Sequence, residues 1–184
     1  MKTFATKLEG CFQIEPKVSG DSRGFFLESF QKNRYQELLG IDKEFVQDNH
    51  SRSSRNVLRG IHSQLKKPQG KLVRVVRGEV FDVAVDLRPN SGSFGKWHST
   101  ILSEENKKQF WVPPGFGHAF LVLSDFADFE YKCTDYYDPE DEFSILWDDP
   151  DLGIGWPIKN PLLSSKDKNA QPFKKYTAFL ANNN

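Results

Sequence analysis

Short strand-forming segments, separated by turn residues about every ten positions, restrict the fold of this chain most strongly. The clearest segments run from Lys71 to Arg77 and from Val80 to Leu87. Further segments are Trp97 to Leu102, Gln109 to Val112, His118 to Leu123, Phe129 to Thr134 and Ser144 to Trp147. The chain also contains 16 Phe, 10 Pro and 13 Gly, which favours strands with frequent turns. We therefore predict an all-β sandwich or barrel.

The two central segments are separated by a Gly-Glu pair. A two-residue turn there would form a hairpin in which Arg77 pairs with Val80. In that register Lys71, Asp82 and Asp86 lie on the same face. A face with acids and a lysine among valines can be exposed to solvent or can line a polar interior, and alternation does not decide between the two.

Helical segments are few. Gln31 to Leu39 contains good helix formers and is followed by Gly40, a residue suited to the position after a helix end. Near the C-terminus, Ser164 or Ser165 can begin a short turn or helix around Lys166 to Ala170.

Charge and cysteine content exclude several classes of protein. Lys and Arg total 25, as do Asp and Glu, so the formal net charge is zero and nothing favours nucleic acid or an anionic membrane as a partner. The 184 residues suit one domain over residues 1–184. Without a secretory signal or long apolar segment, we expect a cytoplasmic protein. Cys11 and Cys133 are too few for a disulfide framework, and we expect reduced packing residues.

Two of the four histidines lie in segments that suggest chemistry. Alternation along a strand would place Arg59 and His62 on opposite faces, and both can face one pocket only if Gly60 lies at a bulge or kink. His118 follows a Pro-Pro-Gly turn with the Pro-x-Gly-x-x-His spacing of the second cupin motif. Metal-binding cupins add a His-x-His pair and a Glu, where this chain has serine and glutamine after its histidine, so we expect no metal.

Cofactor and nucleophile motifs are absent from the sequence. There is no Gly-x-Ser-x-Gly elbow, no Gly-x-Gly-x-x-Gly fingerprint and no phosphate-binding Gly-Lys-[Ser/Thr] loop. NAD and ATP are therefore not indicated, and we expect no cofactor.

Six ordered segments together point to a known family. They are Asp21 to Phe26, Gln47 to Ser51, Arg59 to Gln64, Lys71 to Gly78, Val112 to Phe120 and Tyr131 to Tyr137. With them, the sequence closely resembles the dTDP-4-dehydrorhamnose 3,5-epimerase family from about Phe4 to Lys168. The resemblance implies a cupin-type jelly-roll β-barrel with a few short peripheral helices. It also implies epimerisation of dTDP-4-dehydro-6-deoxy-glucose at C3 and C5 to give dTDP-4-dehydro-rhamnose.

The resemblance further implies four catalytic residues. His62 matches the base that removes a proton next to the C4 ketone, a role that suits a neutral imidazole. Asp167 matches the carboxylate that orients this base, and Tyr131 matches the acid that donates on the opposite face of the sugar ring. Lys71 matches a cation near the developing enolate oxygen. A core aromatic at Tyr131 and a solvent-facing lysine at Lys71 are the alternatives.

Substrate contacts and a partner subunit are also implied. Arg59 and Arg23 suit a diphosphate, and Tyr137 would stack on the thymine. The remaining contacts carried over from the family are Phe25, Glu28, Gln47, Asn49, His118, Glu142 and, with less regular spacing, Lys166. The family is a homodimer in which the segment from Arg23 to Glu28 completes the partner's pocket. Surface salt bridging is the alternative for each charged residue.

Three other functions stay open from the residues alone. A relative could epimerise only one carbon of a related 4-keto sugar nucleotide, with the same fold and base. A non-catalytic cupin could bind sugar nucleotides through the same anion-binding residues. A metal-dependent cupin oxygenase is the third possibility.

Overall fold

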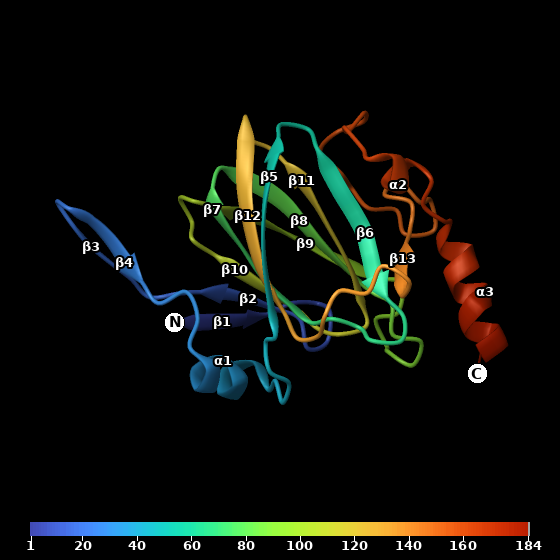
Figure 1. Cartoon of the computed structure of the whole chain (residues 1–184), viewed down its shortest axis with the longest axis horizontal. Helices are drawn as coiled ribbons and strands as arrows, with labels where there is room; N and C mark the ends of the chain where they lie inside the picture. The colour runs from blue at the N-terminus through green and yellow to red at the C-terminus, as the bar shows by residue number, and fades with distance from the viewer. Residues whose placement is uncertain (184) are drawn as a thin grey trace.

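The computed structural model describes residues 1–183. Two antiparallel sheets face each other, and a small hairpin stands apart from them (Figure 1). The sheets have the strand orders β1-β2-β10-β7-β12-β5 and β13-β6-β11-β8-β9, and β3 pairs with β4. The strands are β1 (Lys2–Ala5), β2 (Phe12–Glu15), β3 (Val18–Asp21), β4 (Gly24–Leu27), β5 (Gln47–Ser54), β6 (Leu58–Gln64), β7 (Lys71–Arg77), β8 (Glu79–Asp86), β9 (Trp97–Ser103), β10 (Gln109–Val112), β11 (Phe116–Val122), β12 (Phe126–Cys133) and β13 (Glu142–Ser144).

The main hydrophobic core lies between the two sheets. The six-stranded sheet contributes residues such as Val73, Phe110 and Phe129, and the five-stranded sheet contributes residues such as Val80 and Phe120. Their alternation along each strand places every second side chain in this interior. The predicted strands therefore form because period-two apolar segments bury one face of each sheet against the other.

The predicted hairpin around Gly78 is wrong. β7 and β8 belong to different sheets, and the chain crosses from one sheet to the other at Gly78. Gly78 has φ +80°, and a Cβ at this position would lie 2.1 Å from the carbonyl oxygen of Phe126. Only glycine fits this crossing. The tight turn residue therefore marks a change of sheet rather than a hairpin.

The helices cover the outside of the sheets. α1 (Lys32–Leu39) begins after the cap Gln31 and ends at Gly40, which has the left-handed φ of 63°, and α2 (Ser165–Lys168) is capped by Ser164. Both match the prediction. α3 (Phe173–Asn183) was not predicted, and it packs on the outer face of the five-stranded sheet through an aromatic cluster. Among the described residues, no helix is both long and apolar enough to cross a membrane.

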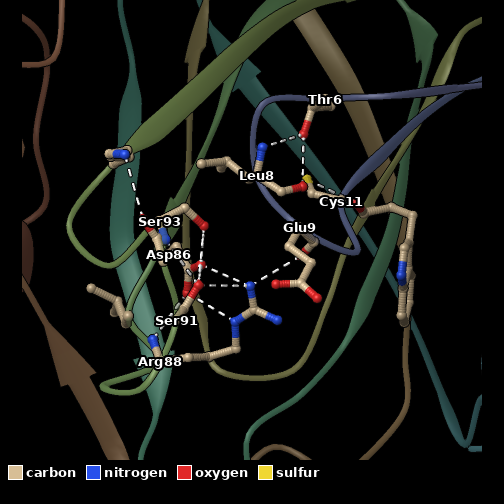
Figure 2. Close-up of polar contacts among 12 residues, drawn as sticks. Thr6, Leu8, Glu9, Cys11, Asp86, Arg88, Ser91 and Ser93 are labelled. Carbon is tan, nitrogen blue, oxygen red and sulfur yellow. Dashed lines mark hydrogen bonds and ion pairs between the residues drawn. The ribbon is translucent and has the colours of Figure 1, made fainter.

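A buried polar network fastens the N-terminal segment to the end of β8 (Figure 2). Asp86 is fully buried and accepts hydrogen bonds from Arg88, Ser91 and Ser93. Arg88 also donates to the backbone carbonyl of Glu9 at 3.0 Å. Burial alone would raise the pKa of Asp86, but these donors lower it to about 2. The carboxylate is therefore ionised and acts as a structural anchor.

Candidate active site

A polar cavity of about 370 Å³ opens between the two sheets. The predicted site residues that line it are His62, Lys71, Tyr131, Gln47, Asn49, Arg59, His118, Tyr137, Glu142 and Lys166. A second hollow of about 360 Å³ is lined by residues such as Asp48, Arg74 and Glu130 and contains neither His62 nor His118. We assign the candidate site to the first cavity because it gathers the imidazoles, the phenol and the lysine.

The bulge expected at Gly60 is present. The pairing of β6 with β11 joins His62 to His118 and Arg59 to Phe120, so β6 carries one extra residue between the two pairs. Gly60 has φ +128°, and a Cβ there would lie 2.3 Å from the Cβ of Ala119. The extra residue cancels one alternation, so Arg59 and His62 both reach the cavity.

His62 and Asp167 meet across 105 positions of sequence. His62 Nε2 lies 2.6 Å from Asp167 Oδ1, and Ser164 donates to Asp167 Oδ2 at 2.8 Å. Burial would raise the pKa of Asp167, but the hydrogen bonds from His62 and Ser164 lower it below its ordinary value. Because an ionised carboxylate only accepts, Nε2 carries the hydrogen and Nδ1 is the nitrogen available to a substrate.

Tyr131 and Lys71 approach the cavity from the six-stranded sheet, opposite the sheet that carries His62. The Lys71 ammonium lies 6.0 Å from the centroid of the Tyr131 ring. Burial raises the pKa of Tyr131, so the phenol stays protonated. Burial also lowers the pKa of Lys71, an effect opposed by the nearby Glu142 and Asp82. Lys71 lines the cavity rather than facing solvent, and Tyr131 lines the cavity while also packing against the hydrophobic core.

Glu142 connects three groups at the cavity. It accepts hydrogen bonds from the Tyr137 hydroxyl and from the Lys166 ammonium, each at 2.7 Å, and its Oε1 lies 3.8 Å from His62 Nδ1. Burial would raise the pKa of Glu142, but Lys166 and Tyr137 lower it overall. The hydrogen bond to Glu142 raises the pKa of Tyr137 to about 12. Lys166, the least regular match, is thus within the site.

Polar side chains from β5 continue the cavity wall. Gln47 donates to Asn49 at 3.1 Å, and Arg59 donates to the hydroxyl of Ser53 at 3.0 Å. Both amides and the guanidinium retain donors that can bind a phosphate or a base. His118 lines the same cavity, and its Nε2 lies 2.9 Å and 3.0 Å from the two oxygens of Asp82.

The three predicted residues of the N-terminal hairpin region do not line this cavity. Arg23 pairs with Asp21 and is 88% exposed, and Phe25 is exposed on β4. Glu28 pairs with Arg34. The hairpin of β3 and β4 projects away from both sheets (Figure 1). These residues can act at a site only if that site belongs to another molecule.

The sequence of this chain is similar to those of known proteins. The model of the family described as dTDP-4-dehydrorhamnose 3,5-epimerase matches residues 5–175. The chain belongs to this family. An enzyme of that name from Shigella flexneri is 54% identical over 98% of this chain and 100% of its own length.

Solved structures of the family support the same assignment. The epimerase from Legionella pneumophila, in complex with dTDP-4-keto-L-rhamnose, is 57% identical with a TM-score of 0.94, over 97% of this chain and 96% of that one. A 3'-monoepimerase from Streptomyces bikiniensis, in complex with dTDP-quinovose, is 36% identical with a TM-score of 0.88, over 95% and 89%. The predicted all-β, cupin-type jelly-roll fold is confirmed.

Sequence reasoning missed several residues at the site of this epimerase-family chain. For Asp82, the sequence did not decide whether its side chain faces solvent or a polar interior. The hydrogen bonds of Ser53 with Arg59 and of Ser164 with Asp167 were not predicted. Alternation along β8 could have placed Asp82 inside once its neighbours were known to be core residues. Within residues 1–183, no group of three or more His, Cys, Asp and Glu side chains is arranged to hold a metal ion.

Proposed function

We propose that this chain epimerises dTDP-4-dehydro-6-deoxy-glucose at C3 and C5 to give dTDP-4-dehydro-rhamnose. The observation that carries the proposal is the meeting of the His62–Asp167 pair with Tyr131 around one cavity. His62 comes from the five-stranded sheet and Tyr131 from the six-stranded sheet, which suits a base and an acid on two faces of one ring. The ligand named for the Legionella pneumophila relative has the same nucleotide and keto sugar.

His62 acts as the base in this proposal. Its Nδ1 removes the proton from C5 or C3, and the electrons of the broken C–H bond move into the C4 carbonyl to form an enolate. Asp167 accepts the hydrogen bond from Nε2 and stabilises the imidazolium that forms. Lys71 lines the cavity, where its ammonium stabilises the enolate oxygen, because a fixed cation is most effective where negative charge develops.

Tyr131 completes the inversion. Its hydroxyl donates a proton to the carbon from the opposite face, and the enolate electrons return to form the new C–H bond. The tyrosinate recovers a proton from solvent, and the imidazolium loses one, so the cycle is balanced. The raised pKa of Tyr131, caused by burial, keeps this donor loaded at neutral pH.

The nucleotide is bound by the polar wall. Arg59 suits the diphosphate, and Gln47 and Asn49 suit the nucleotide or sugar. The Tyr137 ring stacks on thymine once its hydrogen bond with Glu142 is rearranged. Glu142, Lys166 and His118 contact the sugar end. Each of these assignments rests on the position of the side chain at the cavity.

The assembly is also part of the proposal. A homodimer would bring Arg23, Phe25 and Glu28 of one subunit to the other's cavity. The projecting hairpin with its exposed Phe25 and Phe26 supports this, because monomeric proteins rarely leave such apolar side chains uncovered together. The cytoplasmic location stays a prediction.

The proposal is tested by incubating the protein with the 4-keto-6-deoxyglucose nucleotide in D₂O and following C3 and C5 by NMR. We expect deuterium at both carbons together with the inverted product. Deuterium at one carbon only would instead favour a single-site enzyme like the Streptomyces bikiniensis monoepimerase. His62→Ala should abolish exchange. Full turnover in that variant would refute the catalytic role of His62, and absence of turnover in the wild type would leave only a sugar-nucleotide-binding role.

A further inference from the structure

A second imidazole faces the same cavity as His62. His118 on β11 is the direct cross-strand partner of His62 on β6, and opposite residues of an antiparallel pair project on the same face. Both rings line the cavity. Each ring forms a hydrogen bond with an aspartate through Nε2: His62 pairs with Asp167, and His118 pairs with Asp82. The cavity therefore contains two histidine–aspartate pairs, and the mechanism above uses only one of them.

The second pair is held rigidly. Asp82 is fully buried, and both of its oxygens lie within 3.0 Å of His118 Nε2. The His118 ring also stacks on Phe129, with centroids 6.0 Å apart and planes 25° apart, and Phe129 stacks on Phe120 at 4.2 Å. With Nε2 occupied and the ring plane fixed, Nδ1 is the only nitrogen of His118 that can serve the cavity.

We propose that Asp82 is a positioning residue that keeps a hydrogen on His118 Nδ1, so that His118 enters the reaction as a hydrogen-bond donor beside Lys71. This inference deepens the proposed function and rests on it. His62 and His118 then have opposite tasks at one ring. His62 offers a lone pair to the substrate C–H, and His118 offers an N–H to an oxygen.

Burial favours this proton arrangement. One proton is shared between Asp82 and His118 Nε2, and a second can lie on Nδ1. With both protons the pair is neutral overall, wherever the shared proton lies. Without the proton on Nδ1 the pair carries a net negative charge at a buried position, which desolvation disfavours. In agreement, burial raises the pKa of Asp82, although His118 and Lys71 oppose the shift.

Asp167 provides the contrast. It accepts hydrogen bonds from the Ser164 hydroxyl and from His62, whereas both carboxylate oxygens of Asp82 are hydrogen-bonded to His118. The extra donor stabilises an ionised Asp167 and leaves His62 free to be a neutral base. Environments that shift the pKa values of two similar groups in opposite directions are typical of separate acid and base roles.

Other charged and titratable groups face His118 from the surrounding elements. They are Asp82 on β8, Arg59 and His62 on β6, Lys71 on β7, Tyr131 on β12, Tyr137 before β13, Glu142 on β13 and Lys166 of α2. Glu142 is already paired with Lys166 and Tyr137. Lys71 and His118 both line the cavity, and we expect them to share the negative charge of an enolate oxygen.

The direct test is the protonation state of His118 by ¹⁵N NMR of the imidazole nitrogens, with resonances assigned through single His→Gln variants. The wild-type protein without substrate should show a protonated Nδ1 on His118 from pH 6 to pH 8. In Asp82→Ala the neutral ring can instead place its one hydrogen on Nε2, so the signal of a protonated Nδ1 should weaken at the same pH. An unprotonated Nδ1 in the wild type at pH 7 would overturn the proposal without any activity measurement.

The kinetic test is the ratio of kcat for Asp82→Ala to kcat for wild type as a function of pH. Above pH 7.5 we expect a loss of about 10²-fold, the scale of one removed oxyanion donor, with KM changed little. The ratio should recover at lower pH because the His118 ring then regains its proton. A ratio that stays constant with pH would reduce Asp82 to a structural role.

Two further variants guard against an unstable protein. Asp82→Asn can donate an amide N–H to Nε2 and leave the hydrogen on Nδ1, so it should keep most of the activity that Asp82→Ala loses. Asp86→Asn is the matched control, since Asp86 is a buried aspartate on the same face of β8 that bonds to Arg88. It should leave the His118 spectrum and the pH ratio unchanged. If the wild type exchanged no deuterium, the proposed function would fail, while the NMR result would still decide the role of Asp82.

Discussion

Gly60→Ala tests whether the bulge in β6 is what brings Arg59 and His62 to one cavity. The added Cβ would lie 2.3 Å from Ala119 Cβ and 2.7 Å from the His118 carbonyl oxygen, at φ +128°. A non-glycine residue in such a backbone conformation costs about 1–3 kcal/mol. Overpacking against a neighbouring strand adds about 1–3 kcal/mol. We therefore expect a loss of about 2–6 kcal/mol in the free energy of unfolding.

The assay is urea unfolding followed by circular dichroism, at one fixed protein concentration, together with turnover of the keto-sugar nucleotide. Turnover should fall with stability, because relief of the clash requires β6 to move relative to β11. Gly92→Ala is the control: its added Cβ meets no atom within 4 Å, so its stability should change by less than about 0.5 kcal/mol. A Gly60→Ala protein with wild-type stability and turnover would refute the role of the bulge.

Three further predictions address the pairs around the cavity and β8. Asp167→Asn should lower kcat by about 10²- to 10⁴-fold with little change in KM, because the amide cannot stabilise the imidazolium; steady-state kinetics at pH 7 checks this. Tyr131→Phe should retain deuterium exchange into substrate but lose most inverted product by NMR. The pKa of Asp86 is about 2 in the folded protein and lies below the ordinary value of 3.8, so the stabilising contribution of Asp86 is complete above about pH 5. Relative to Asp86→Asn, the wild type should lose about 2 kcal/mol of its free energy of unfolding as the pH falls toward 2. Urea unfolding of both proteins at several pH values checks this, and an equal loss of stability in the two proteins would contradict it.

Local patterns predicted the elements better than their partners. The strand from Gln109 to Val112 and the helix ending at Gly40 were predicted with the observed limits or within one residue, because alternation and capping are local properties. The hairpin at Gly78 failed since turn residues do not report whether the next strand pairs with the previous one or crosses to another sheet. Lys71 and Asp82 nevertheless both face the interior, from opposite sheets rather than from one.

Site residues that depend on distant contacts could not come from alternation. The His62–Asp167 pair spans 105 positions and was predicted through the family resemblance. The Asp82–His118 pair spans 36 positions and was missed, because nothing local links an acid in β8 to an imidazole in β11. Gly60 is the exception, since strand alternation and a shared pocket for Arg59 and His62 conflict unless the strand has a bulge or kink there, and the structure shows the bulge.

One cross-strand pair accounts for the proximity of both imidazoles, but it does not give them the same chemistry. His62 and His118 project from adjacent strands into one cavity, so their difference must come from the carboxylate behind each ring. Asp167 also accepts from the Ser164 hydroxyl at the start of α2, which lowers the cost of its charge. Asp82 is enclosed between the sheets and shares its proton with His118. If Ser164→Ala lowered kcat no more than the control Gly92→Ala does, this division of labour would need another cause.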